Sequence, residues 1–154
     1  SDYGANLDNS KEDFDQAVTT GRWERFLSAV NAGIATVEAF MNHQYMVRLK
    51  VRSDDRALKD KIESKLKSWP KLLTGHSLDL SGRNWATFMK FKTLRNEGFQ
   101  HRKSISSGIN RGVHLALLNE FKYAIPGLLV DLHIHFQVRC PSIIIRYAYF
   151  PKIE

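Results

Sequence analysis

The chain is poor in cysteine and contains no long hydrophobic run. Cys140 is the single cysteine among 154 residues, which excludes an internal disulfide framework and any all-cysteine zinc site. No stretch of about 20 apolar residues is present, so we expect no transmembrane helix and no membrane partner. Hydrophobic residues make up 43% of the chain and charged residues 25%, a balance that indicates a globular domain rather than a disordered chain.

Several motifs of catalysis and cofactor binding are also missing. The nine glycines are scattered and form neither a phosphate-binding loop nor a dinucleotide-binding pattern. There is no Gly-x-Ser-x-Gly nucleophile turn, and no histidine pair at i and i+4 with a glutamate between them. His133 and His135 would share a face only on a strand, without a carboxylate pair nearby. We therefore assign no cofactor and no metal site.

Positive charge is abundant, and it is unevenly distributed. The net charge is +7, but residues 1–15 alone carry −4, so the other 139 residues carry +11. A body this basic favours a polyanionic partner, nucleic acid before membrane. Residues 1–20 predict an acidic flexible arm, and residues 21–154 predict a single helical domain. The chain begins at Ser1 rather than at a methionine, which leaves open a longer native protein.

The first long apolar pattern predicts a helix over about 22–50. Glu38 and Asn42 flank it, and the Glu38 carboxylate is either paired with an arginine elsewhere or, as we favour, solvated. The stripe has helical spacing over about six turns and consists of Trp23, Leu27, Val30, Ile34, Val37, Met41 and Tyr45.

Three further helices are predicted before residue 126. Acids at Asp54 and Asp55 favour a helix start, and Trp69-Pro70 predicts its end after about residue 67. A loop over 70–83 follows, and then a helix over about 84–97. The next helix starts after Ser104 and meets Pro126. The 84–97 helix is predicted to bury Trp85, Phe88, Phe91 and Leu94.

The C-terminal part of the chain fits two patterns. Apolar residues alternate with polar ones from Leu132 to Val138, which is a strand pattern, so residues 131–150 could form a hairpin. Leu128, Leu132 and Phe136 also form a helical stripe. We favour a fifth helix, because four helices need a partner for their apolar faces. The predicted fold class is all-α, a helical bundle of about five helices.

The segment from Arg83 to Lys103 combines six bases and one acid with interleaved aromatic residues. Arg95 offers a guanidinium fork suited to a phosphate oxygen, and His101 offers a group suited to proton transfer near neutral pH. Asn96 could orient the substrate or His101. Gly98 breaks the helix between them and can bring His101 back toward Arg95. Four further bases would guide an RNA backbone: Lys90, Lys92, Arg102 and Lys103.

The stretch Arg95-Asn96-Glu97-Gly98-Phe99-Gln100-His101 resembles the Arg-polar-x(n)-His signature of the HEPN family (higher eukaryotes and prokaryotes nucleotide-binding). The apolar Leu94 before it, and the long helices before and after it, also resemble that family over roughly residues 22–125. This resemblance implies an all-α homodimer in which two motifs face each other. In many members it implies metal-independent ribonuclease activity, with catalytic residues that correspond here to Arg95, Asn96 and His101.

The sequence therefore predicts a metal-independent endoribonuclease that cleaves RNA through the 2′-hydroxyl. The resemblance implies a toxin or an antiviral, abortive-infection effector in a prokaryotic cytoplasm, with an antitoxin or a larger complex as a further partner. The alternative is a non-catalytic helical module of a larger protein that binds RNA or acts as a scaffold. A DNA-binding regulator is a weaker third hypothesis, because no packing signature of a helix-turn-helix can be located.

Overall fold

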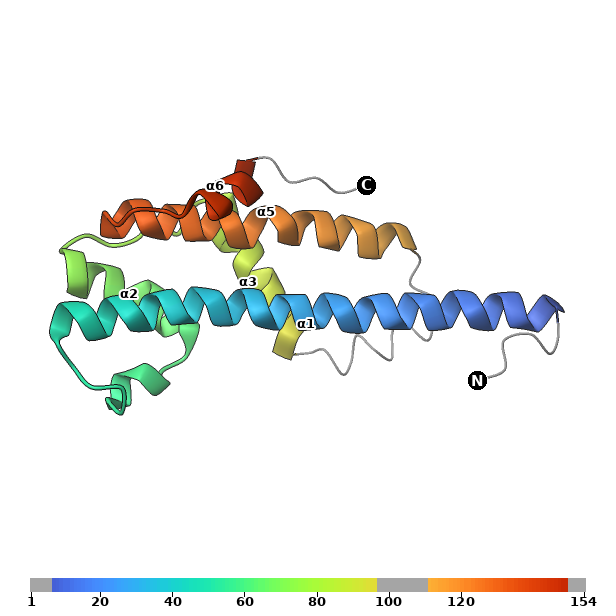
Figure 1. The fold of residues 1–154 in the computed structure, drawn as a ribbon, viewed down its shortest axis with the longest axis horizontal. Helices are drawn as coiled ribbons and strands as arrows, with labels where there is room; N and C mark the ends of the chain where they lie inside the picture. Colours follow the sequence, from blue (N-terminus) through green and yellow to red (C-terminus); the bar gives the residue numbers. More distant parts are fainter. Residues whose placement is uncertain (1–6, 97–110, 150–154) are drawn as a thin grey trace.

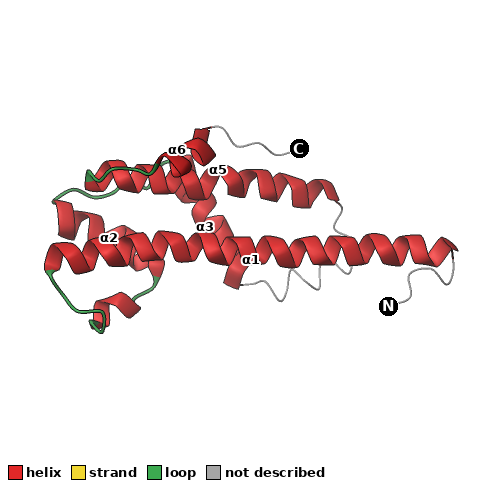
Figure 2. Ribbon diagram, viewed as in Figure 1, coloured by secondary structure: helices red, strands yellow, loops and turns green. Residues whose placement is uncertain are grey.

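The computed structural model describes residues 7–96 and 111–149, and these are helical with no strand among them (Figures 1 and 2). This confirms the all-α prediction. The elements in chain order are α1 (Leu7–Leu49), the 3-10 helix η1 (Arg56–Lys59), α2 (Ile62–Thr74), α3 (Arg83–Asn96), α5 (Arg111–Phe136) and α6 (Ser142–Tyr149).

Two long helices, α1 and α5, lie side by side and run in the same direction (Figure 1). α3 crosses them and packs against both, while α2 packs against the C-terminal part of α1. α6 returns along α5. At Gly33 the two long helices come so close that a Cβ atom would lie 3.0 Å from Phe121 Cζ. A larger residue there would push the Phe121 and Ile125 side chains away, so glycine favours this close approach of the helices.

The core is built from the apolar stripes that the sequence predicted. Val30, Ile34, Val37 and Met41 of α1 are each at most 1% exposed. They pack in one cluster with residues from the other helices, including Phe88, Phe91 and Leu94 of α3 and Leu128, Leu132 and Phe136 of α5.

α1 begins earlier than predicted. It starts at Leu7 rather than near residue 22, so residues 7–20, which we assigned to a flexible arm, belong to this helix. No proline interrupts the sequence of α1. The acids Asp8 and Glu12 also lie near its N-terminus, where the helix dipole favours negative charge. These two properties account for a helix where hydrophobic periodicity is weak.

Two prolines do not end helices as predicted. α2 continues through Pro70 to Thr74, and Gly75 ends it in the left-handed region with φ 85°. The loop before α3 is correspondingly shorter than the predicted 70–83. α5 continues through Pro126 to Phe136. Each proline removes one backbone hydrogen bond, but residues close to it in the same helix are buried in the core, and this packing holds the helical path. They include Leu66, Trp69, Ala124, Ile125, Leu128 and Leu129.

Asp55 caps η1 rather than an α-helix. Its carboxylate accepts a hydrogen bond from the backbone N–H of Ala57 at 2.9 Å. The predicted N-cap is therefore present, but the helix after it is only a single 3-10 turn, and α2 begins separately at Ile62.

Residues 131–149 form no hairpin. α5 extends to Phe136, and α6 follows Pro141. The C-terminus of α5 is closed by Gln137 in the left-handed region and by the Val138 N–H, which donates to the His133 carbonyl at 3.0 Å. The Arg48 guanidinium donates to the Phe136 carbonyl at 2.5 Å, which places a positive charge at the negative end of the helix dipole. The alternation was misleading, because the helical stripe is the one that is buried.

Candidate functional site

The predicted site begins at the C-terminal end of α3. Leu94 is buried and fixes the last turn to the core, whereas Arg95 beside it is half-buried and Asn96 is exposed. Arg95 and Asn96 are the last two residues of α3, as the sequence predicted. The end of a helix leaves carbonyl groups without intrahelical partners, so polar groups of backbone and side chain gather at this point.

His101, Arg102 and Lys103 lie outside the described residues. The approach of His101 to Arg95 and the contribution of Arg102 and Lys103 to RNA binding therefore stay predictions. The same holds for the homodimer in which two motifs would face each other.

The two predicted RNA-binding lysines of α3 point to different neighbours. Residues two apart on a helix are separated by about 200°, so Lys90 and Lys92 cannot follow one backbone together. The Lys90 ammonium contacts the Glu120 carboxylate of α5 at 2.7 Å, and the Lys92 ammonium contacts the Glu63 carboxylate of α2 at 2.8 Å. Sequence reasoning grouped the two lysines by charge and missed this difference in direction.

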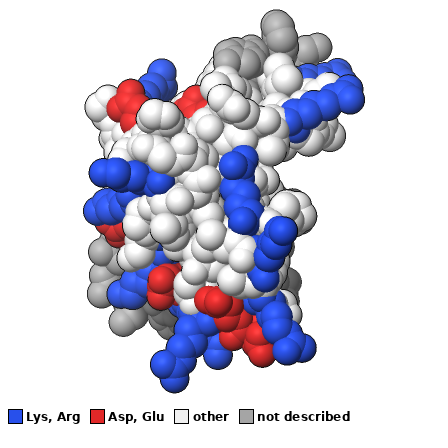
Figure 3. All heavy atoms as spheres, turned by 90° about the vertical axis from the view of Figure 1, so that its left-hand side faces the viewer, with Lys and Arg blue, Asp and Glu red and all other residues white. Residues whose placement is uncertain are grey.

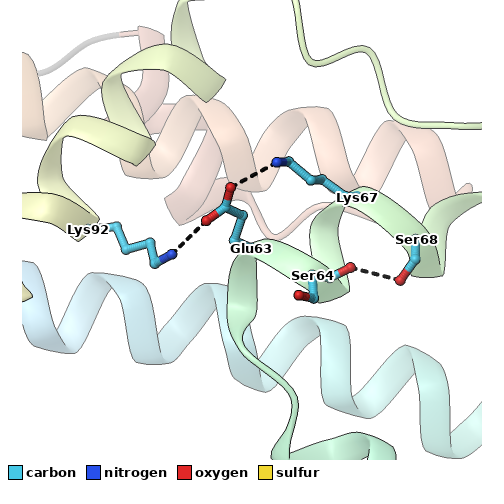
Figure 4. Close-up of polar contacts among 5 residues, drawn as sticks. All are labelled: Glu63, Ser64, Lys67, Ser68 and Lys92. Carbon is cyan, nitrogen blue, oxygen red and sulfur yellow. Dashed lines mark hydrogen bonds and ion pairs between the residues drawn. The ribbon is translucent and has the colours of Figure 1, made fainter.

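Glu63 is bound by two lysines from two helices (Figure 4). One carboxylate oxygen contacts Lys67 on the next turn of α2 and the other contacts Lys92, each at 2.8 Å. The Lys92 side chain is only 13% exposed, while that of Lys67 is 55% exposed. Hydrogen bonds from Lys67 and then Lys92 lower the pKa of Glu63 from its ordinary 4.5 to about 2. The i,i+4 pair with Lys67 was readable from the sequence; the contact with Lys92 was not.

The pH dependence of stability should report this carboxylate. Its pKa is depressed in the folded state, so its contribution is present above pH 4.5 and is lost as the pH falls toward about 2. Urea unfolding of the parent and of Glu63→Gln should therefore differ most near neutral pH and converge under acid conditions. Asp54→Asn is the control, because Asp54 is exposed. A difference that stays constant from neutral pH down to pH 2 would contradict this prediction.

Much of the positive charge lies in one part of the chain. Residues 50–96 contain twelve bases and five acids, giving +7, which equals the net charge of the entire chain. These residues form the connection after α1, then η1, α2 and α3. Figure 3 looks at the end of the molecule where α2 lies and shows lysine and arginine side chains over that face, with acidic groups between some of them. The basic surface is therefore broad rather than confined to the motif.

A buried lysine lies where α1, η1 and α2 meet. The Lys65 side chain is fully buried, and its ammonium donates to Asn42 Oδ1 at 2.8 Å and to the Leu58 carbonyl at 2.7 Å. Glu38 lies 3.5 Å from the same ammonium, which also faces the Trp69 ring. Glu38 keeps the solvated position that we favoured, with a side chain that is 42% exposed, and its basic partner is a lysine rather than an arginine. The group is fully bonded and serves structure.

The two C-terminal histidines have structural contacts. The His133 ring is buried against the Phe40 ring, with Nδ1 2.6 Å from the Leu129 carbonyl. His135 Nε2 lies 3.0 Å from the Thr74 hydroxyl and 2.9 Å from the His76 carbonyl. A carbonyl only accepts, so Nε2 carries a proton there and cannot act as a base toward Thr74.

Two features are absent from the described part of the chain. In these residues no three histidine, cysteine, aspartate or glutamate side chains are grouped so that they could hold a metal ion. No helix among them is both long enough and apolar enough to cross a membrane.

Comparisons with known proteins give no functional assignment for this chain. No protein-family model, no curated protein and no solved structure matches the chain. The resemblance to the HEPN family therefore stays a hypothesis, carried by the motif from Arg95 to His101 and by the helices around it.

Proposed function

We propose that the chain is a metal-independent endoribonuclease that cleaves RNA through the neighbouring 2′-hydroxyl. The observation that carries the proposal is the motif at the end of α3. Leu94 anchors the last turn, and Arg95 and Asn96 reach the surface immediately before the segment that contains His101. The all-α fold and the basic surface of residues 50–96 support the same proposal.

Each motif residue has a chemical role in this mechanism. Arg95 binds the scissile phosphate and stabilises the negative charge that develops on its oxygens. His101 takes the proton from the 2′-hydroxyl or gives a proton to the leaving 5′-oxygen. The 2′-oxygen attacks phosphorus, the bond to the 5′-oxygen breaks, and a 2′,3′-cyclic phosphate forms without water. Asn96 orients the substrate or His101. The biological setting of the proposal is a cytoplasmic toxin or antiviral effector that acts as a homodimer.

The test is cleavage of labelled RNA by the purified chain in excess chelator. We expect cleavage at an unchanged rate, a product that ends in a 2′,3′-cyclic phosphate, and no cleavage of DNA with the same sequence. The His101→Ala variant, purified in parallel, controls for contaminating ribonucleases. Cleavage that stops with chelator, or DNA cut at a similar rate, would show that the motif has been misread.

A second candidate is a non-catalytic module that binds RNA or another subunit. The observation that favours it is the basic surface of residues 50–96, which extends well beyond the motif and needs no catalytic group to bind RNA. RNA binding by the parent chain without any cleavage would support this candidate over the enzyme.

A further inference from the structure

The inference that follows rests on the proposed function and concerns the route of the RNA beyond the motif. The buried face of α2 packs on the core through Ile62, Leu66 and Trp69. Its opposite face carries side chains that suit backbone phosphates, lysine and serine. They are all exposed and lie at helical spacing: Ser64, Lys67, Ser68 and Lys71.

The ion pair between Lys92 and Glu63 fixes this face of α2 relative to the motif. Lys92 and Arg95 are three residues apart, or about 60° around α3, and the Lys92 side chain reaches Glu63 of α2. Figure 4 shows Lys92 reaching from α3 to Glu63, with Lys67 on the other side of the same carboxylate. Lys92, Glu63 and Lys67 are therefore neighbours on one surface, and Arg95 lies three residues beyond Lys92 on α3.

Lys90 lies on a different side of α3. Its ammonium is held by Glu120 of α5, about 200° around the helix from Lys92. An RNA strand that leaves Arg95 past Lys92 would move away from Lys90. The chain thus contains a lysine that is close in sequence to the motif but lies off this path.

We propose that the exposed face of α2, formed by Ser64, Lys67, Ser68 and Lys71, binds the phosphates of single-stranded RNA that continues from Arg95. Lys67 and Lys71 lie one turn apart and contact successive phosphates through their ammonium groups. Lys92 positions Glu63 rather than binding RNA, because its side chain is largely buried. Glu63 repels the phosphates and limits the affinity of this face.

The test measures the affinity for a labelled 2′-O-methyl RNA strand, which cannot be cleaved through the 2′-hydroxyl. Binding is monitored by fluorescence anisotropy over a range of salt concentrations. Replacing Lys67 and Lys71 together by alanine should reduce the salt slope by about 1.4, from two contacts of about 0.7 each. That slope corresponds to an affinity about 25-fold weaker at 0.1 M salt than the parent's, with little difference at 1 M. Replacing Arg139 and Arg146 together by alanine is the matched control, because both are exposed bases outside residues 50–96, and this variant should bind nearly as the parent does.

A second variant gives a change in the opposite direction. Glu63→Gln removes a negative charge beside the phosphates and should tighten RNA binding about threefold to fivefold. If this face of α2 has only a structural role, Glu63→Gln should not increase the affinity for RNA.

If the variant with both Lys67 and Lys71 replaced binds RNA with the same affinity and salt slope as the parent, the inference is overturned. The proposed function would still stand. A parent chain that binds no RNA would overturn the proposed function, and the inference with it.

Discussion

Replacing His101 by alanine is expected to lower the rate of RNA cleavage by about 10²–10⁴-fold, the usual contribution of a general acid or base. The affinity for RNA should change little, because the charges that bind phosphate lie on other side chains. Cleavage should be measured as a single turnover with saturating protein, so that the rate reports the chemical step. Binding is measured separately with the uncleavable 2′-O-methyl strand.

Arg95→Ala should behave differently from His101→Ala. In the proposed mechanism Arg95 binds the phosphate in both the ground state and the transition state, so its loss should weaken binding and also lower the cleavage rate by about 10²–10³-fold. His43→Ala is a matched control for the histidine replacement, because His43 is exposed on α1, away from the end of α3. A His101→Ala variant that is fully folded, binds RNA and cleaves at the parent rate would remove His101 from the mechanism.

Replacing the buried Lys65 by methionine is expected to lower the free energy of unfolding by about 2–3 kcal/mol. Methionine keeps most of the buried stem, so the change isolates the ammonium. The Asn42 side chain and the Leu58 carbonyl lose the donor that lies 2.8 Å and 2.7 Å away. Because Leu58 belongs to η1, the hydrogen bond between η1 and α2 is lost as well. Thermal unfolding should shift down by about 5–10 °C.

Two further variants make the Lys65 result interpretable. Lys71→Met changes an exposed lysine of the same helix and should alter stability by less than about 0.5 kcal/mol. Combining Lys65→Met with Asn42→Leu removes an acceptor together with its donor, so it should recover part of the loss. Equal stability of the parent and Lys65→Met would show that the contacts of the ammonium contribute nothing net.

The sequence predicted the features that depend on local periodicity. The buried positions of α3, Phe88, Phe91 and Leu94, follow directly from helical spacing, as does the stripe of α1 from Val30 to Met41. The placement of Arg95 at the end of α3 was also predictable, because its position follows from the length of the same helix.

Features that depend on tertiary packing were not predictable. Pro70 and Pro126 are local signals for helix ends, and burial of their neighbours outweighs them. The contact between Lys92 and Glu63 joins residues 29 positions apart, so it depends on how α2 and α3 each pack against α1 and α5. The opposed directions of Lys90 and Lys92 could have been predicted from their spacing alone, but the acids that hold them could not.

The parallel course of α1 and α5 has a consequence for how fast the chain folds. Arg48 and the Phe136 carbonyl, which join the ends of these helices, are 88 residues apart, and Gly33 meets Phe121 at a similar separation. Closing a loop of this length lowers the conformational entropy of the chain before the contacts can form. Bundles whose neighbouring helices are consecutive avoid that cost, so this chain should fold more slowly than an up-and-down bundle of equal length. The docking of α5 onto α1 is then the late step that completes the core.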